Sequence, residues 1–332
     1  MWFDASTAPY AESDGVIALR RVRGFHVGGR ALDLQGLPPR AIETVPGEPP
    51  RRSDPNGRHQ VGQLYAQYFE LARAVHDTPV LLWHGGGMTG ATWEETPDGR
   101  PGWHDHFMRR GFHTCVSDAV ERGRASWAPY PEITPAGPEH RTVDQAWSIF
   151  RFGLDGGYRS GAAYEGMRFP VGCVDQLGKQ FVARWTCNTA WAVAAYAELL
   201  QRFGRSIIVA HSEGARHAAQ LAALMPQAVA AVVLLEPAGA PALDAGAARG
   251  AAAVPHLVVW GDHFGQSDLW RRYRATAELW LDQLRAAGGR VDTLDLPANG
   301  IFGNSHLLMM DDNSADIAAQ VADWIQAQVP RG

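Results

Sequence analysis

Cysteine is scarce in this chain, and long apolar runs are missing. Only three cysteines occur among 332 residues, at Cys115, Cys173 and Cys187. An odd and sparse count argues against a disulfide scaffold, although it leaves open a bridge between Cys173 and Cys187 in an oxidising compartment. No run of apolar residues is long enough to cross a bilayer, so the sequence predicts no membrane span.

A concentrated positive charge is also missing. The formal net charge is -5 at pH 7, and arginines are scattered along the chain rather than gathered in a stripe. Because nucleic-acid binding requires a positive surface against the phosphates, no nucleic-acid partner is expected. The start, MWFDASTAPYAESDG, has no basic stretch followed by an apolar one, which predicts no export signal. The expected location is cytoplasmic for the chain as given, and periplasmic or secreted if a signal peptide was removed.

The order of apolar runs predicts an α/β fold built as a single domain over 1–332. Residues 16–34 alternate and break at Gly28-Gly29, the pattern of a β-hairpin with a glycine turn, and 61–71 indicate a further strand. Short apolar runs then alternate with helical patterns. The expected strands are 79–84, 112–119, 206–211, 229–236, 255–262 and 291–297, and the expected helices are 189–203, 215–225, 267–287 and 314–328. An antiparallel start, a mostly parallel central sheet and helices on both faces are therefore expected.

Residues 120–187 do not follow this alternation. They are rich in proline, glycine and aromatic residues, and the segment is too long for an ordinary connection. We expect an insertion within the same domain that forms a cap over the sheet. Its aromatic side chains, Phe150 and Phe152 among them, are expected to line an apolar substrate pocket.

A serine directly follows the strand 206–211, in the string Ala210-His211-Ser212-Glu213-Gly214. A nucleophile elbow has the form G-x-S-x-G, with the serine on a strained turn between a strand and a helix. Small residues are needed two positions before and after the serine because the strand and helix pass close together, and Ala210 and Gly214 meet that need. The alternative is a serine that only caps a helix.

The string HGGGMTG at 84–90 favours the elbow. It follows an apolar strand and matches the HGGG-type loop of lipases and esterases, so the N–H groups of Gly86 and Glu213 are the expected donors to an oxyanion. The same glycines satisfy G-x-G-x-x-G, the loop of an NAD(P)-binding oxidoreductase. That loop needs a helix directly after it, which the prolines and glycines of 97–102 forbid, so no cofactor is expected. No metal is expected either, because His104-Asp105-His106 lacks a third ligand at suitable spacing.

The base and acid that would activate Ser212 are sought further along the chain, in the order serine, acid, histidine. His306 lies beyond the last expected strand and is the only histidine after His263. Asp262 and Glu236 each end an apolar strand, and either would orient the imidazole. A glutamate after so apolar a run is costly unless it is paired, whereas an aspartate after Trp-Gly serves as a turn former, which favours Glu236.

These motifs resemble the α/β-hydrolase superfamily from about Val80 onward. The string D-x-x-x-x-G-R-x-S from Asp118 to Ser126 adds to the glycine loop, the elbow and the late GNSH. More narrowly, TGATWEETPDGRPGW, AWSIFRFG, VVLLEPAG and FGNSHLLMMDDN resemble bacterial carboxylesterases of the esterase-713-like group. That resemblance implies a Ser–Glu–His triad whose glutamate follows the sixth strand, which here is Glu236.

The sequence thus predicts a serine hydrolase that cleaves carboxylic esters through an acyl-enzyme. Ser212 attacks the carbonyl, His306 takes and returns the proton, Glu236 orients His306, and Gly86 with Glu213 hold the oxyanion. Activity is expected to fall near pH ~6.5 as the imidazole protonates. The expected partner is a small-molecule ester, and the expected assembly is a monomer or a homodimer. Besides the oxidoreductase, the alternative is a non-catalytic binder with the same fold.

Overall fold

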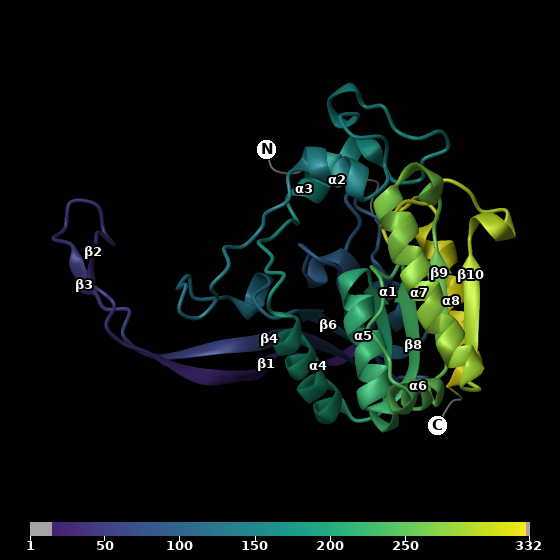
Figure 1. Cartoon of the computed structure of the whole chain (residues 1–332), viewed down its shortest axis with the longest axis horizontal. Coiled ribbons are helices and arrows are strands. Elements are labelled where there is room, and N and C mark those ends of the chain that lie inside the picture. Colours follow the sequence, from purple (N-terminus) through teal and green to yellow (C-terminus); the bar gives the residue numbers. More distant parts are fainter. Residues whose placement is uncertain (1–14, 330–332) are drawn as a thin grey trace.

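The computed structural model describes residues 15–329, so residues 1–14, on which the expectation about an export signal rests, lie outside it. The apolar runs of the sequence form the parallel part of one eight-stranded sheet, in the order β1-β4-β6-β5-β7-β8-β9-β10 (Figure 1). The parallel strands are β6 (Phe112–Asp118), β5 (His76–Trp83), β7 (Ser206–His211), β8 (Val229–Leu235), β9 (His256–Trp260) and β10 (Val291–Asp295). Every residue of β7 and β8 is buried, as expected for parallel strands that helices cover on both faces.

The N-terminal part of the sheet is antiparallel, as predicted, but the predicted hairpin at Gly28-Gly29 is wrong. β1 (Leu19–Leu34) continues through both glycines and pairs with β4 (Gly57–Leu71), which in turn pairs antiparallel with β6. Both glycines have positive φ, and a Cβ on Gly28 would lie 2.8 Å from the Cα of Ala195. Gly28 therefore allows a helix to pass close to a continuous strand, and Gly29 lies against the paired strand β4, where a Cβ would be 2.9 Å from the carbonyl oxygen of Val61.

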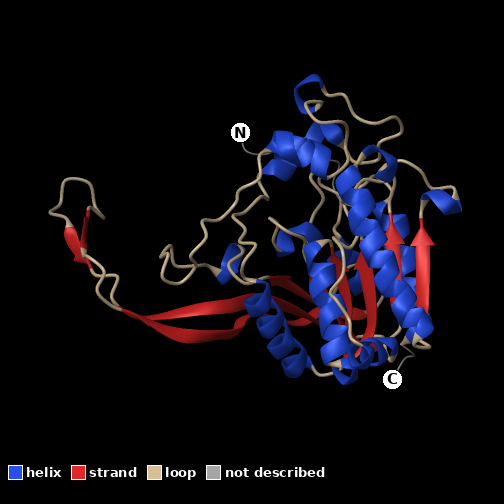
Figure 2. Ribbon diagram, in the orientation of Figure 1, coloured by secondary structure: helices blue, strands red, loops and turns tan. Residues whose placement is uncertain are grey.

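The C-terminal end of β1 and the N-terminal end of β4 form an arm that extends away from the rest of the molecule (Figure 2). The chain between these two strands carries the short antiparallel pair β2 (Arg40–Ile42) and β3 (Arg51–Ser53). Most residues of this connecting segment are exposed. The arm therefore adds little to the main core.

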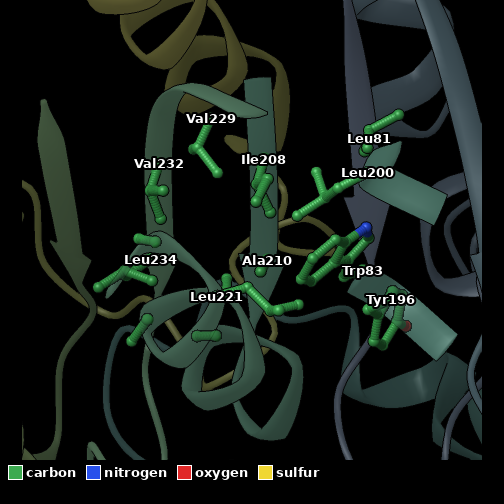
Figure 3. Close-up of a cluster of buried hydrophobic side chains, with 14 of the residues drawn as sticks. Leu81, Trp83, Tyr196, Leu200, Ile208, Ala210, Leu221, Val229, Val232 and Leu234 are labelled. Carbon is green, nitrogen blue, oxygen red and sulfur yellow. The ribbon is translucent and has the colours of Figure 1, made fainter. Parts of the chain in front are cut away.

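Helices cover both faces of the sheet, as predicted. One face packs against α4 (Thr189–Phe203), α5 (Glu213–Leu224), α6 (Ala245–Ala252) and α7 (Asp268–Ala286), and the other against α1 (Trp103–Arg109) and α8 (Ser314–Gln328). In Figure 3, Leu221 of α5 and Tyr196 of α4 lie around Ala210 of β7. The Tyr196 ring stacks on Trp83 of β5, with 4.0 Å between centroids. Bulky side chains therefore pack against the end of β7, just before Ser212, from one face of the sheet.

Residues 120–187 consist mainly of loops with two short helices, α2 (Val143–Ile149) and α3 (Val174–Gly178). Both helices lie on the side toward which the parallel strands point (Figure 2). The segment contacts loops at that edge: the Phe150 carbonyl accepts from His306 N at 2.9 Å, and Arg168 N donates to Gly303 O at 2.9 Å. This places the segment next to the residues that follow the strands.

Two further expectations concern cysteines and membrane spans. Cys115, Cys173 and Cys187 are all free thiols in the structure, so no bridge joins Cys173 to Cys187. Among residues 15–329, no helix combines the length and the apolar character that a membrane crossing requires.

Candidate active site

Ser212 lies on a strained turn between β7 and α5. Its φ is +54°, a left-handed conformation that residues other than glycine rarely adopt. The turn is held by a hydrogen bond of 2.9 Å from Ser212 N to Leu235 O of the neighbouring strand. A Cβ at Gly214 would lie 2.5 Å from the carbonyl oxygen of His84, so only glycine fits there. The local geometry is that of a nucleophile elbow.

The glycine loop after β5 approaches the same turn. His84 accepts from Ala119 N through Nε2 at 2.9 Å, and Asp118 accepts from Gly90 N at 2.8 Å, so both ends of the loop are anchored to the strand next to it. After the loop comes a single 3-10 turn, Gly90–Trp93, and the next α-helix begins only at Trp103. The helix that a dinucleotide loop requires is therefore not there.

Gly86 and Glu213, the two expected N–H donors, both line the pocket that contains Ser212. Within residues 15–329, neither N–H donates to a protein acceptor. Glu213 is the first residue of α5, where the N–H groups of a helix have no intrahelical partner and carry partial positive charge. Two unused donors next to a serine hydroxyl are suited to hold a negatively charged oxygen.

His306 is buried in the loop before α8 and borders the same pocket as Ser212. Its imidazole Nδ1 lies 3.2 Å from the Oε2 atom of Glu236. The ring packs against Trp270, with 3.9 Å between centroids. The neighbouring Ser305 is fixed by Asp311, which accepts from its N–H at 2.8 Å and from its hydroxyl at 2.7 Å. The loop therefore holds the imidazole in one orientation.

Of the two acidic candidates, only Glu236 contacts His306. Asp262 instead accepts from the backbone N–H groups of His263 and Gly303. Glu236 is fully buried directly after β8, with a φ of +50°. Its carboxylate therefore points into the interior beside the imidazole, and Asp262 shapes a turn.

Arg151 is a functional candidate that sequence reasoning missed. It is fully buried, and its Nη1 and Nη2 atoms donate to the two carboxylate oxygens of Glu236 at 2.9 and 2.8 Å. Its Nε donates to the carbonyl of Asp262 at 2.8 Å. A charged residue between two phenylalanines in a loop-rich segment gives no local signal of burial, and only the folded segment brings it to Glu236. The pair satisfies the requirement that a buried carboxylate be neutralised.

Electrostatics favour the neutral form of His306. Burial, with added repulsion from Arg151 and Arg141, holds the pKa of His306 well below its usual value. The imidazole is therefore unprotonated at neutral pH, the state in which it accepts a proton. His211 lies next to it, with 4.5 Å between ring centroids and the ring planes tilted by 45°, and burial likewise holds the pKa of His211 well below its usual value.

The pocket has a volume of about 290 Å³. Phe150 lines it and stacks on His306, with 5.9 Å between ring centroids. Phe152 does not line it but packs behind Phe150 against Phe169, with 4.0 Å between centroids. Of the two phenylalanines expected to contact substrate, only Phe150 borders the cavity.

The side chains near the pocket offer no metal-binding cluster. Across residues 15–329, no three His, Cys, Asp or Glu side chains gather as metal ligands. Of the His104-Asp105-His106 string, Asp105 pairs with Arg109 at 2.7 Å.

One solved structure is similar to this chain over nearly its whole length. It is described as a novel bacterial esterase at atomic resolution, with 31% sequence identity, a TM-score of 0.82, and coverage of 95% of this chain and 98% of that one. This chain belongs to the bacterial esterases of the α/β-hydrolase fold. This chain is also 24% identical over 330 residues to a protein named "Probable secreted lipase phiG" from a fungal species (strain ATCC 74256), across 82% of this chain and 88% of the relative. No family model matches the chain.

Membership in this family establishes the class of reaction. The esterase is a serine hydrolase of the α/β-hydrolase type and acts on carboxylic esters. Its narrower resemblance to the esterase-713-like group stays a prediction.

Proposed function

We propose that the esterase cleaves its ester by a Ser212–His306–Glu236 triad through an acyl-enzyme. The observation that carries this proposal is the 3.2 Å contact between His306 Nδ1 and Glu236 Oε2, behind a pocket that Ser212 and His306 both line. The strained φ of Ser212 supports it, because strain is kept where a side chain must be presented in one direction.

The chemistry follows from the state of each group. Neutral His306 takes the proton of the Ser212 hydroxyl through Nε2 while the serine oxygen attacks the ester carbonyl. Its Nδ1–H donates to Glu236, which fixes the tautomer and stabilises the imidazolium that forms. His306 then returns the proton to the leaving alcohol. Water enters next, and His306 removes its proton while the water oxygen attacks the acyl carbonyl. His306 then gives that proton to the Ser212 oxygen as the bond to the acyl group breaks, which releases the acid and restores the serine.

The oxyanion of each tetrahedral intermediate is held by the N–H groups of Gly86 and Glu213. Both are without protein acceptors among the described residues, so they are available to the developing charge. In serine hydrolases one such donor stabilises the transition state by about 2.7–4 kcal/mol. Arg151 keeps the Glu236 carboxylate in place as a positioning residue.

We also propose that residues 120–187 form a cap in a single domain with the sheet. The segment supplies Phe150 to the pocket and Arg151 to Glu236. It therefore shapes the substrate cavity and supports the triad at once.

A panel of 4-nitrophenyl esters tests the mechanism. The wild-type chain should release 4-nitrophenol with an initial burst equal to the number of active sites where deacylation is slow. Ser212→Ala should abolish both the burst and turnover while the circular dichroism spectrum is unchanged. Turnover by folded Ser212→Ala at the wild-type rate would contradict the proposal.

A further inference from the structure

Four arginines gather at the pocket that contains Ser212. Arg141, Arg184 and Arg216 line it, and Arg122 is buried behind it. Among the lining residues, Glu213 is the only one with a carboxylate. The pocket wall therefore carries more positive than negative charge.

Two of the arginines share that single carboxylate. Arg184 Nη2 lies 3.0 Å from Glu213 Oε1, and Arg122 Nη2 lies 3.4 Å from Glu213 Oε2. With these contacts, both oxygens of Glu213 are occupied. Glu213 also attracts Arg141 and Arg216 at longer range, but one carboxylate does not balance the charge of four guanidinium groups.

Arg141 and Arg216 are left with neutral partners. Arg141 Nη1 lies 3.4 Å from the carbonyl of Gly86, and Arg216 Nη2 lies 3.4 Å from the hydroxyl of Thr189. In the part of the chain that the structure describes, neither makes an ion pair. Glu213 and the solvent-exposed Glu139 attract Arg141 from a distance, but neither forms an ion pair with it among the described residues.

Arg141 also lies close to the reacting groups. Its guanidinium carbon is 4.9 Å from the centre of the Phe150 ring, which itself stacks on His306. Burial and the nearby Arg184 lower the pKa of Arg141 to about 10, so it keeps its charge at neutral pH. A partly buried charge without a counter-ion is costly, and a negatively charged group in the pocket would remove that cost.

We propose that the substrate is a small ester with a second, anionic group, such as a carboxylate, and that Arg141 and Arg216 bind this group. The inference rests on the proposed function, because it places the ester carbonyl at Ser212. Ile149, Leu269, Trp270 and Tyr273 provide apolar wall for the few carbons between the two groups. A cavity of about 290 Å³ is at the small end for ligand pockets and suits a short chain.

Matched pairs of esters that differ only in charge test this specificity. Monoethyl succinate is compared with ethyl succinamate for an anion on the acyl side, and O-acetylglycolate with O-acetylglycolamide for an anion on the alcohol side. In at least one pair, kcat/KM for the carboxylate should exceed that for the amide by about tenfold or more. A charge-assisted hydrogen bond contributes a difference of this size. Equal rates in both pairs would overturn the inference.

Arginine variants show whether these side chains cause the preference. In Arg141→Gln and Arg216→Gln, the ratio of kcat/KM for the preferred carboxylate to that for its amide should fall about tenfold. Arg205→Gln, which removes one exposed positive charge outside the pocket, should keep the wild-type ratio. Loss of activity on both esters by the same factor in the pocket variants would overturn the inference.

Binding separates this inference from the proposed mechanism. By calorimetry, Ser212→Ala should bind the preferred anionic ester more tightly than its amide, and a second substitution Arg141→Gln should remove the difference. Hydrolysis of neutral esters without charge-selective binding would overturn the anion site and leave the triad intact. Charge-selective binding by a chain that hydrolyses no ester would overturn the triad, and with it the claim that the anion is a substrate.

Discussion

Arg151 and Glu236 form a two-point ion pair in the interior, with nitrogen–oxygen distances of 2.9 and 2.8 Å and no exposure of either side chain. The arginine comes from residues 120–187 and the glutamate from the end of β8. The pair therefore connects the proposed cap to the proposed triad acid. Because the same carboxylate faces His306, a change at Arg151 should alter the chemistry of the site as well as its stability.

Arg151→Met should lower the free energy of unfolding by about 3–5 kcal/mol, because it leaves the charge of Glu236 buried without a partner. The pKa of His306 should rise, since Arg151 now holds it down and the unpaired carboxylate would favour the imidazolium. The acid limb of kcat/KM should therefore move to higher pH. Denaturant unfolding and a pH–rate profile measure the two effects.

Arg274→Met is the matched control for that variant. Arg274 also lies over the ring of Phe264, as Arg151 does, but it pairs with Asp295 at the end of β10. Arg274→Met should lower the free energy of unfolding by less than Arg151→Met and should not shift the acid limb of the kcat/KM profile. A limb that shifts equally in both variants, or in neither, would contradict the role given to Arg151.

The acid limb of the wild-type profile should lie below pH ~6.5, the value for an unperturbed imidazole. Neutral His306 is the active form, and burial together with Arg151 and Arg141 lowers its pKa. Activity should thus persist as pH falls through ~6.5 and decline only in more acidic solution. A half-maximal kcat/KM at or above pH 6.5 would be inconsistent with the buried imidazole.

Glu236→Gln and Asp262→Asn distinguish the two candidate acids. The first removes the charge that stabilises the imidazolium, and kcat should fall on the order of 10³- to 10⁴-fold. The second loses at most one of two backbone hydrogen bonds, because His263 N donates to Oδ1 and Gly303 N to Oδ2 and the amide keeps one oxygen. It changes no contact with His306, so its loss of kcat should be much smaller. Steady-state kinetics with folding checked by circular dichroism decides the matter. A larger loss in Asp262→Asn would assign the acid to Asp262.

Gly214→Ala tests the close contact at the elbow. The added methyl group would lie 2.5 Å from the His84 carbonyl oxygen, so strand and helix must separate, at a cost of about 1–3 kcal/mol in stability and with a loss of kcat. Gly246→Ala makes the same change at the second residue of α6, where the nearest atom is a side-chain oxygen of Asp244 at 3.2 Å and, among the described residues, no backbone atom outside the helix is near. That variant should keep its stability or gain up to ~1 kcal/mol. Equal effects of both substitutions would remove the elbow argument.

The strands and the elbow were predictable because their signals are local. A short apolar run such as 207–210, bounded by polar residues, is typical of a strand buried on both faces. Gly214, two residues after Ser212, shows where strand and helix meet. The prediction of a hairpin turn at the two glycines of β1 was wrong for a physical reason. Glycine is favoured both in hairpin turns and where a strand has positive φ or another element packs closely against it, and the sequence does not distinguish these cases.

The surroundings of the site were not predictable to the same degree. Arg141 and Trp270 reach the pocket, and Arg151 reaches Glu236, from segments far from Ser212 in sequence, and no spacing rule connects them. For the same reason the sequence suggested an unperturbed imidazole, because burial of His306 depends on residues that only the fold brings around it. The two phenylalanines of 150–152 differ only in which direction the folded loop turns them.

The most direct measurement of the central claim is covalent labelling with a fluorophosphonate followed by peptide mass spectrometry. An activated serine next to two free N–H donors should form a stoichiometric adduct at Ser212, and Ser212→Ala should form none. His306→Ala should label far more slowly, because the base is lost. A wild-type protein that stays unlabelled, or that carries the adduct on another residue, would contradict the account.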